Sequence, residues 1–213
     1  MDTDVEIGVG DVRLPGHLAV PRDAAEVVVF AHGSGSSRNS PRNQYVASVL
    51  NRSGLGTVLF DLLTPGEEAN RGNVFDIALL AERLAGATAW LRAQPGAAGL
   101  LVGYFGASTG AAAALWAAAE AGAGAGVAAV VSRGGRPDLA GARLGMVRAP
   151  TLLIVGENDE TVLELNRRAQ AELRCENELA VVPGATHLFM EPGTLATVAG
   201  LARDWFTGHL DPG

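Results

Sequence analysis

Short runs of β-branched and other apolar residues alternate with helical patterns along almost the whole chain. Uninterrupted apolar runs of this kind are typical of strands that are buried on both faces of a parallel sheet. The predicted strands are residues 26–31, 57–61, 100–105, 127–132, 151–155 and 178–182. Apolar residues at three-to-four spacing, or rows of alanine, predict helices over 74–91, 109–121, 160–174 and 193–208. The alternation predicts an α/β fold, with a mostly parallel central sheet and helices on both of its faces.

The start of the chain follows a different pattern. Residues 4–9 and 11–20 alternate in polarity around a turn at Gly8–Asp11, which predicts an antiparallel hairpin at the edge of the sheet. A length of 213 residues fits a single domain over 1–213. The stretch 133–148 between two predicted strands is too short to hold a cap domain.

Composition excludes several classes of function. The net charge is −7 and aromatic residues make up 5% of the chain, so nucleic acid is not an expected partner. All 16 cationic residues are arginine, which excludes chemistry that needs a lysine, such as a Schiff base or a P-loop. Cys175 is the single cysteine, so no internal disulfide or cysteine-based metal site is possible. We therefore expect no metal and no cofactor.

The sequence also predicts where the protein resides. The acidic N-terminus lacks the apolar stretch of a secretory signal, and a lone cysteine fits a reducing compartment. Residues 110–131 are rich in Ala and Gly but contain Glu120 and a glycine cluster, which argues against a membrane span. We expect a cytoplasmic protein with no membrane partner.

The pentapeptide Gly106–Gly110 (GASTG) matches the pattern G-x-S-x-G between a predicted strand and a predicted helix. A sharp strand-to-helix turn at this place would thrust the hydroxyl of Ser108 outward in a strained backbone conformation. The flanking glycines suit positions where a Cβ would clash, and Ala111 to Ala114 allow the helix to approach the sheet closely. The alternative is a serine that simply caps a helix rich in small residues.

A serine nucleophile needs a base, and the chain has four histidines. His17 lies in the predicted hairpin, His32 precedes a Gly-rich loop, and His209 is four residues from the C-terminus. His187 lies in a loop just past the predicted strand 178–182, and parallel sheets gather their sites at the carboxyl ends of strands. His187 is therefore the predicted base.

An acid that orients the histidine should follow another strand. After the predicted strand 151–155 the sequence reads GENDE. Asp159 has the expected reach, whereas Glu157 and Glu160 are the alternatives. Asp159 could instead cap the helix that follows. The chain order Ser, Asp, His matches that of hydrolases with this kind of sheet.

Two backbone N–H groups should stabilise the negative oxygen of a tetrahedral intermediate. One is predicted to be the amide of Thr109, at the N-terminus of the helix after Ser108. The other should come from the loop 32–35, with Ser34 as the expected donor and Gly35 as the alternative. Arg133 and Arg136 follow the predicted strand 127–132 and could hold a substrate carboxylate, although Asp138 lies close enough to pair with them.

Taken together, the segments AHGSGSS, GASTG, GENDE and GATH resemble the α/β-hydrolase fold, and most closely its small dienelactone-hydrolase-like branch. The resemblance covers about residues 24 to 210. It implies Ser108 as nucleophile, Asp159 as orienting acid, His187 as base, and Ser34 with Thr109 as the oxyanion hole. Dienelactone hydrolases carry a cysteine nucleophile where this chain has Ser108, so the resemblance does not extend to dienelactone as the substrate.

The sequence thus predicts a serine hydrolase that cleaves small-molecule carboxylic esters through an acyl-enzyme on Ser108. The same triad could serve a thioesterase, a peptidase or an acyltransferase. A binding protein that keeps the fold without catalysis is the alternative from a different class. The sequence leaves the acyl group, the alcohol and the oligomeric state open.

Overall fold

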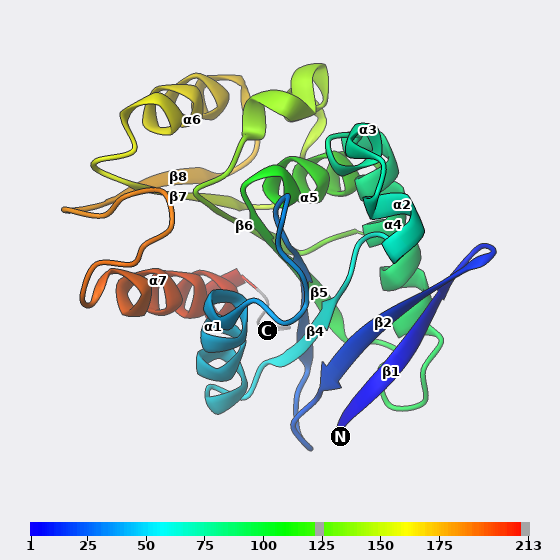
Figure 1. The fold of residues 1–213 in the computed structure, drawn as a ribbon. Helices are drawn as coiled ribbons and strands as arrows, with labels where there is room; N and C mark the ends of the chain where they lie inside the picture. Colours follow the sequence, from blue (N-terminus) through cyan, green and yellow to red (C-terminus); the bar gives the residue numbers. More distant parts are fainter. Residues whose placement is uncertain (122–125, 210–213) are drawn as a thin grey trace.

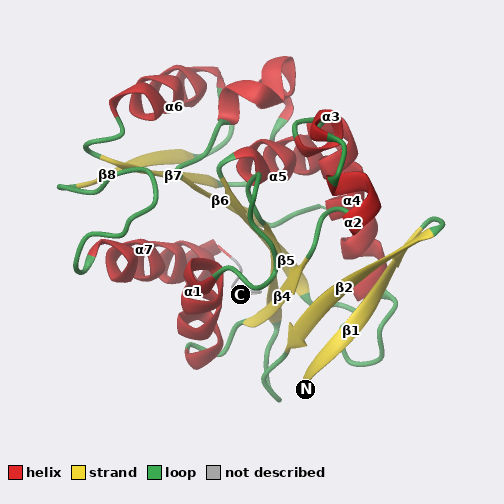
Figure 2. Cartoon of the chain, in the orientation of Figure 1, coloured by secondary structure: helices red, strands yellow, loops and turns green. Residues whose placement is uncertain are grey.

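The computed structural model describes residues 1–121 and 126–209, and it shows a twisted sheet with helices on both faces (Figure 1). The sheet has eight strands in the order β1-β2-β4-β3-β5-β6-β7-β8. The first two strands pair antiparallel with each other, β2 pairs antiparallel with β4, and all later pairs are parallel. The chain therefore has the α/β fold that its sequence predicts, with the hairpin at one edge of the sheet and, in the described residues, no separate cap domain (Figure 2).

The bounds of the elements are as follows. The strands are β1 (Asp2–Val9), β2 (Val12–Ala19), β3 (Glu26–Ala31), β4 (Gly56–Phe60), β5 (Leu101–Ala107), β6 (Ala129–Arg133), β7 (Thr151–Gly156) and β8 (Asn177–Val182). The helices are α1 (Pro41–Arg52), α2 (Pro65–Glu68), α3 (Arg71–Val74), α4 (Ile77–Arg92), α5 (Thr109–Glu120), α6 (Glu160–Glu172) and α7 (Thr194–His209). A 3₁₀ segment, η1 (Pro137–Met146), lies between β6 and β7.

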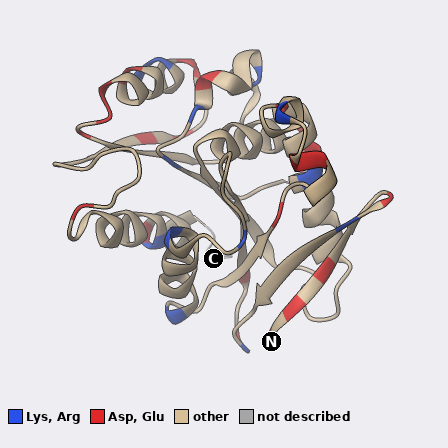
Figure 3. Ribbon diagram, viewed as in Figure 1, with Lys and Arg blue, Asp and Glu red and all other residues tan. Residues whose placement is uncertain are grey.

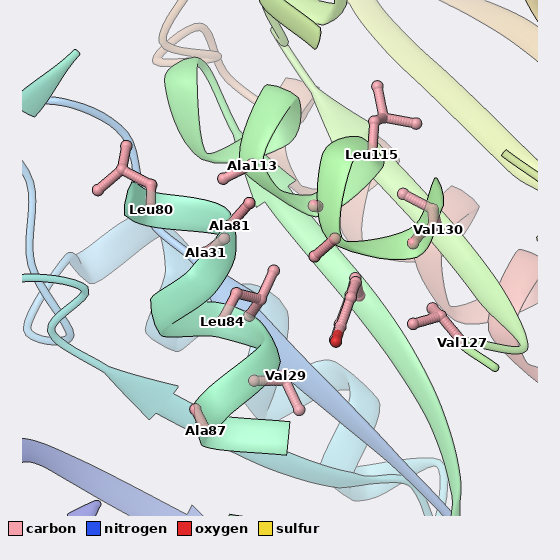
Figure 4. Close-up of a cluster of buried hydrophobic side chains, with 14 of the residues drawn as sticks. Val29, Ala31, Leu80, Ala81, Leu84, Ala87, Ala113, Leu115, Val127 and Val130 are labelled. Carbon is pink, nitrogen blue, oxygen red and sulfur yellow. The ribbon is translucent and has the colours of Figure 1, made fainter. Parts of the chain in front are cut away.

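Each face of the sheet has its own apolar core. On one face α4 and α5 pack together, and Figure 4 shows Ala81 of α4 beside Ala113 of α5. Residues Ala111 to Ala114 are fully buried, which confirms that these small side chains let α5 lie tightly against the sheet. On the other face α1 and α7 contact each other over Phe30 and Phe105. Charged residues lie mainly on the surrounding helices, loops and hairpin (Figure 3).

The structure corrects several predicted boundaries. The predicted helix 74–91 begins at Ile77, because the carboxylate of Asp76 accepts a hydrogen bond from the backbone N–H of Leu79 and caps α4. The predicted strand 127–132 is β6, which runs one residue further to Arg133 because that residue pairs with Ala107. Helix α1 was not predicted, nor were the short helices α2 and α3 or the segment η1. No helix within the described part of the chain has the length and apolar character needed to cross a membrane.

Candidate active site

Ser108 lies between β5 and α5 with a strained backbone, at φ 52° and ψ −120°. A residue other than glycine rarely adopts such a positive φ. The strained backbone persists only when the surrounding structure holds it there. The N–H of Ser108 donates to the carbonyl of Arg133 at 3.2 Å, while its own carbonyl accepts from the N–H groups of Ala111 and Arg136, both at 3.1 Å. Its side chain makes no capping bond to α5, so Ser108 does not act as a helix cap.

The two glycines of the elbow are placed where a larger residue would collide with backbone. A Cβ at Gly106 would lie 2.4 Å from Cα of Ala111, and one at Gly110 would lie 2.2 Å from the carbonyl oxygen of Ala31. Real Cβ contacts are never that short. The sharp turn therefore depends on both glycines, as the G-x-S-x-G pattern predicts.

His187 and Asp159 meet beyond the carboxyl ends of β8 and β7, at the same end of the strands as Ser108. Nδ1 of His187 donates to Oδ2 of Asp159 at 2.6 Å, which fixes the proton on Nδ1 because an ionised carboxylate only accepts. The Asp159 side chain makes no capping bond to α6, and the carboxylate of Glu157 accepts from the N–H of Gly184 instead. Of the three candidate acids, the structure thus brings Asp159 to the histidine.

The loop of His187 also lies beside the elbow. Gly134, which follows the carbonyl that holds Ser108, is so close that a Cβ there would be 3.5 Å from the His187 ring. Among the described residues, no hydrogen bond involves Oγ of Ser108 or Nε2 of His187. Both atoms are thus free of competing partners. A hydrogen bond between a nucleophile and its base often forms only when substrate is bound.

The other histidines are engaged elsewhere. Nδ1 of His32 donates to the carbonyl of Gly33 and Nε2 accepts from the N–H of Leu62, so both ring nitrogens of this histidine hold loops together. His17 binds two acids on the hairpin, and the hydrogen bond to Asp4 is the main cause that raises its pKa. His209 binds a carbonyl within α7 and a carboxylate outside it.

The single cysteine lies near the start of β7, at the opposite end of the strands from Ser108. Cys175 follows α6, and its Sγ contacts Oγ1 of Thr151 at the start of β7. Burial raises the pKa of its thiol, which disfavours the thiolate. Cys175 therefore cannot take the place of Ser108.

The predicted oxyanion donors are neighbours. Thr109 is the first residue of α5, where backbone N–H groups have no acceptor within the helix. The N–H of Ser34 donates to Oγ1 of Thr109 at 3.0 Å, so this amide already has an acceptor. Gly35 follows with φ +67°. Thr109 and either Ser34 or Gly35 stay the predicted donors.

The two predicted substrate-binding arginines differ in their surroundings. Arg136 forms two hydrogen bonds with Asp138, at 2.9 and 2.7 Å, and this partner raises the pKa of its guanidinium. Arg136 is thus occupied by the local acid that the sequence offered as its alternative partner. Arg133 is buried, and it makes no hydrogen bond with its side chain among the described residues.

A cavity of about 190 Å³ adjoins the elbow on the α4 and α5 face. Ser34 and Thr109 are among its lining residues, and an ion pair of 2.7 Å between Arg38 and Asp61 lies in its wall. Most of the remaining wall is apolar, with Pro15, Leu62, Leu63, Pro65, Val74 and Leu80. This wall could not be predicted from the sequence, since part of it belongs to the short helices α2 and α3, which were not predicted. Within residues 1–121 and 126–209, no three His, Cys, Asp or Glu side chains could hold a metal ion.

No protein-family model matches the chain. The solved structure of a dienelactone hydrolase from Anabaena variabilis has a TM-score of 0.94 and 53% identity, covering 99% of both chains. Est1E from Butyrivibrio proteoclasticus has a TM-score of 0.79 at 14% identity, covering 97% of this chain and 98% of that one, a likeness of fold alone.

The sheet order, the strained elbow and these neighbours define an α/β-hydrolase. Within that fold, the chain belongs to the dienelactone hydrolase family. Two curated relatives from strains of Mycobacterium tuberculosis, each named "Putative phosphoribosyl transferase", are 64% identical over 209 residues. The match covers 98% of this chain and 47% of each relative, so the chain spans about half the length of these proteins. Their name describes the longer proteins.

Proposed function

We propose that this chain is a serine hydrolase that cleaves small carboxylic esters through an acyl-enzyme on Ser108. The observation that carries the proposal is the hydrogen bond of 2.6 Å between Nδ1 of His187 and Oδ2 of Asp159, in loops beside the strained backbone turn at Ser108. Its closely similar relative is named a dienelactone hydrolase, and a lactone is a cyclic carboxylic ester.

The first half of the reaction forms the acyl-enzyme. Oγ of Ser108 attacks the ester carbonyl while Nε2 of His187 takes the hydroxyl proton. Asp159 holds the imidazole in the required tautomer and stabilises the imidazolium that forms. The negative oxygen accepts hydrogen bonds from the amide of Thr109 and from that of Ser34 or Gly35. His187 then returns the proton to the departing alcohol.

The second half releases the acid. Nε2 of His187 takes a proton from water, the water oxygen attacks the acyl carbonyl, and Ser108 leaves with the proton that His187 returns. The apolar cavity beside Ser34 and Thr109 suits an apolar part of the substrate, because removing its apolar wall, which includes three leucines, from contact with water is favourable in free energy.

A substrate panel tests the reaction class. Purified protein is assayed with oxygen esters, matched thioesters, amides and an added alcohol as competing acyl acceptor. We expect oxygen esters to have the highest kcat/KM and water to be the main acceptor. Faster thioester or amide cleavage, or dominant transfer to the alcohol, would replace the ester-hydrolase assignment with the corresponding class. No turnover of any member would support a binding protein.

Replacing Asp159 with Asn should lower kcat by about 10⁴-fold with little change in KM, since the amide no longer fixes the proton on Nδ1 of His187. The matched control is Glu160→Gln, which removes an exposed carboxylate one residue away and should retain activity. Steady-state ester hydrolysis measures both variants. Equal losses in the two would show that Asp159 is not the acid that orients the base.

A further inference from the structure

Four residues at the end of β6 and before η1, 133–136, hold the backbone of Ser108 from both sides. The carbonyl of Arg133 accepts a hydrogen bond from the N–H of Ser108 at 3.2 Å, and the N–H of Arg136 donates to the carbonyl of Ser108 at 3.1 Å. These bonds fix the peptide groups on either side of a strained residue, whose φ of 52° persists only because its surroundings impose it. The position of the nucleophile therefore depends on the position of this segment.

The same segment contacts the groups that act on Ser108. A Cβ at Gly134 would lie 3.2 Å from the carbonyl oxygen of His187 and 3.5 Å from its Nδ1, so Gly134 packs against the base. The N–H of Gly134 donates to the carbonyl of Ile154 at 2.7 Å, on the strand that leads to Asp159. A shift of this segment would therefore move Ser108 relative to both His187 and Asp159.

A buried side chain of α6 anchors the segment. Asn166 is fully buried, and its Nδ2 donates to the carbonyl of Gly135 at 3.0 Å. Among the residues that the structure describes, no other group donates to that carbonyl, and no other side chain forms a hydrogen bond with the backbone of residues 133–136. Nδ2 also donates to the carbonyl of Val162 at 2.8 Å, within the same helix. The bond to Gly135 is thus the one through which Asn166 holds another part of the chain.

The amide of Asn166 also has a cost. Its Oδ1 is enclosed and has no hydrogen-bond partner in the described part of the chain. A buried acceptor without a donor lowers stability, and each such atom in a folded protein needs an explanation. Gly135 is itself buried, and a Cβ there would lie 2.0 Å from Oγ of Ser132 and 2.7 Å from Cβ of Ala111. The segment is thus closely packed against β6 and α5, and Asn166 satisfies the carbonyl that this packing buries.

We propose that Asn166 is a positioning residue of the active site, whose amide holds residues 133–136, and through them Ser108, in place against His187. This inference rests on the proposed function, because it concerns the alignment of the same catalytic groups. Asn166 is not itself catalytic, since both hydrogen bonds of its side chain go to backbone carbonyls. Asp159 lies at the N-terminus of the helix that carries Asn166, so one helix joins the orienting acid to the support of the nucleophile.

Replacing Asn166 with Leu removes the amide and keeps a side chain of similar volume. The carbonyl of Gly135 loses its donor, so residues 133–136 relax and Ser108 moves. We expect kcat for ester hydrolysis to fall about 10- to 100-fold, since a misplacement of about 1 Å can cost about 10²-fold in rate. KM should stay within about twofold, because the apolar cavity is unchanged. The rate of fluorophosphonate labelling, which needs no ester, should fall by the same factor as kcat.

Asn51→Leu is the matched control. Nδ2 of Asn51 donates to the carbonyl of Leu55 at 2.9 Å and to Oγ1 of Thr57 at 3.1 Å, near the start of β4 and at the end of the strands away from Ser108. Each variant loses two hydrogen bonds of an amide, so each should lower Tm, by roughly 2–8 °C. Only Asn166→Leu should lower kcat. Equal kcat losses in the two folded variants, a normal kcat in Asn166→Leu, or a loss through KM alone would overturn the positioning role.

Asn166→Ala provides the same comparison if Asn166→Leu does not fold, because the smaller side chain pushes no neighbour aside. If neither variant folds, the amide serves the fold and the proposal fails. A wild-type protein that hydrolyses no ester would overturn the proposed function, and the role of Asn166 with it. Wild-type ester hydrolysis with an unchanged kcat in Asn166→Leu would leave the hydrolase standing and remove only the role of Asn166.

Discussion

Replacing Ser108 with Ala is expected to lower kcat for ester hydrolysis by about 10⁵-fold while leaving KM little changed. The substitution removes the atom that forms the acyl-enzyme, and it leaves the cavity and both predicted oxyanion donors in place. Any residual rate would come from binding and from stabilisation of the negative oxygen alone. The measurement is steady-state hydrolysis of the best ester of the panel, followed to low rates with concentrated protein.

The same variant should stay folded, which makes the kinetic result interpretable. Oγ of Ser108 makes none of the hydrogen bonds of the described residues, whereas the backbone bonds that hold φ at 52° are independent of the side chain. We therefore expect an unchanged urea midpoint. Near-full activity in a folded Ser108→Ala protein would refute Ser108 as the nucleophile.

Replacing Gly110 with Ala is expected to destabilise the protein by about 3 kcal/mol or more. The added Cβ would lie 2.2 Å from the carbonyl oxygen of Ala31 and 2.5 Å from that of His32. Both contacts are with backbone, at the last residue of β3 and at the first residue after it, so the collision moves α5 away from the sheet instead of turning one side chain aside. Urea unfolding measures the loss of free energy of unfolding, and activity should fall with it because Ser108 lies two residues away.

Gly200→Ala is the matched control for this substitution. Gly200 lies within α7, and a Cβ there would meet no atom within 4 Å. Alanine favours a helix over glycine, so this variant should be more stable by about 0.5–1 kcal/mol. Gly110 is also helical, and the same preference would apply there if packing did not oppose it. A Gly110→Ala protein as stable as Gly200→Ala would contradict the close approach of α5 and β3.

Much of the fold could be predicted from the sequence because the strands are buried on both faces. Residues 26–31 and 151–155 have few or no polar side chains, and they form β3 and β7 with almost the predicted bounds. Helix α1 was not predicted because its sequence is mostly polar. The helix packs on the sheet through a narrow apolar stripe that includes Val46 and Leu50. The signal that could have found it is Ser40 before Pro41, a cap followed by proline at the first helical position.

The candidate site divides in the same way between local and distant determinants. The elbow at Ser108 is encoded within five residues, so its backbone could be predicted from the motif. Which of three acids would meet His187 depends on how two loops lie against each other. The same holds for which of two arginines finds a partner: Arg136 is paired with Asp138, whereas Nη1 of Arg133 is unpaired. Arg42 lies near Arg133 although the two residues are 91 positions apart in the sequence and Arg42 belongs to a helix that was not predicted. No local sequence pattern could predict this contact.

Covalent labelling tests the central claim most directly. Intact protein is treated with a fluorophosphonate, which phosphonylates activated serine hydroxyls, and the adduct is located by mass spectrometry of its peptides. We predict one adduct per chain, on Ser108, and much slower labelling in His187→Ala because the base is missing. An adduct on another residue, or no labelling at a concentration that modifies a known serine hydrolase, would contradict the assignment of Ser108 and His187 as nucleophile and base.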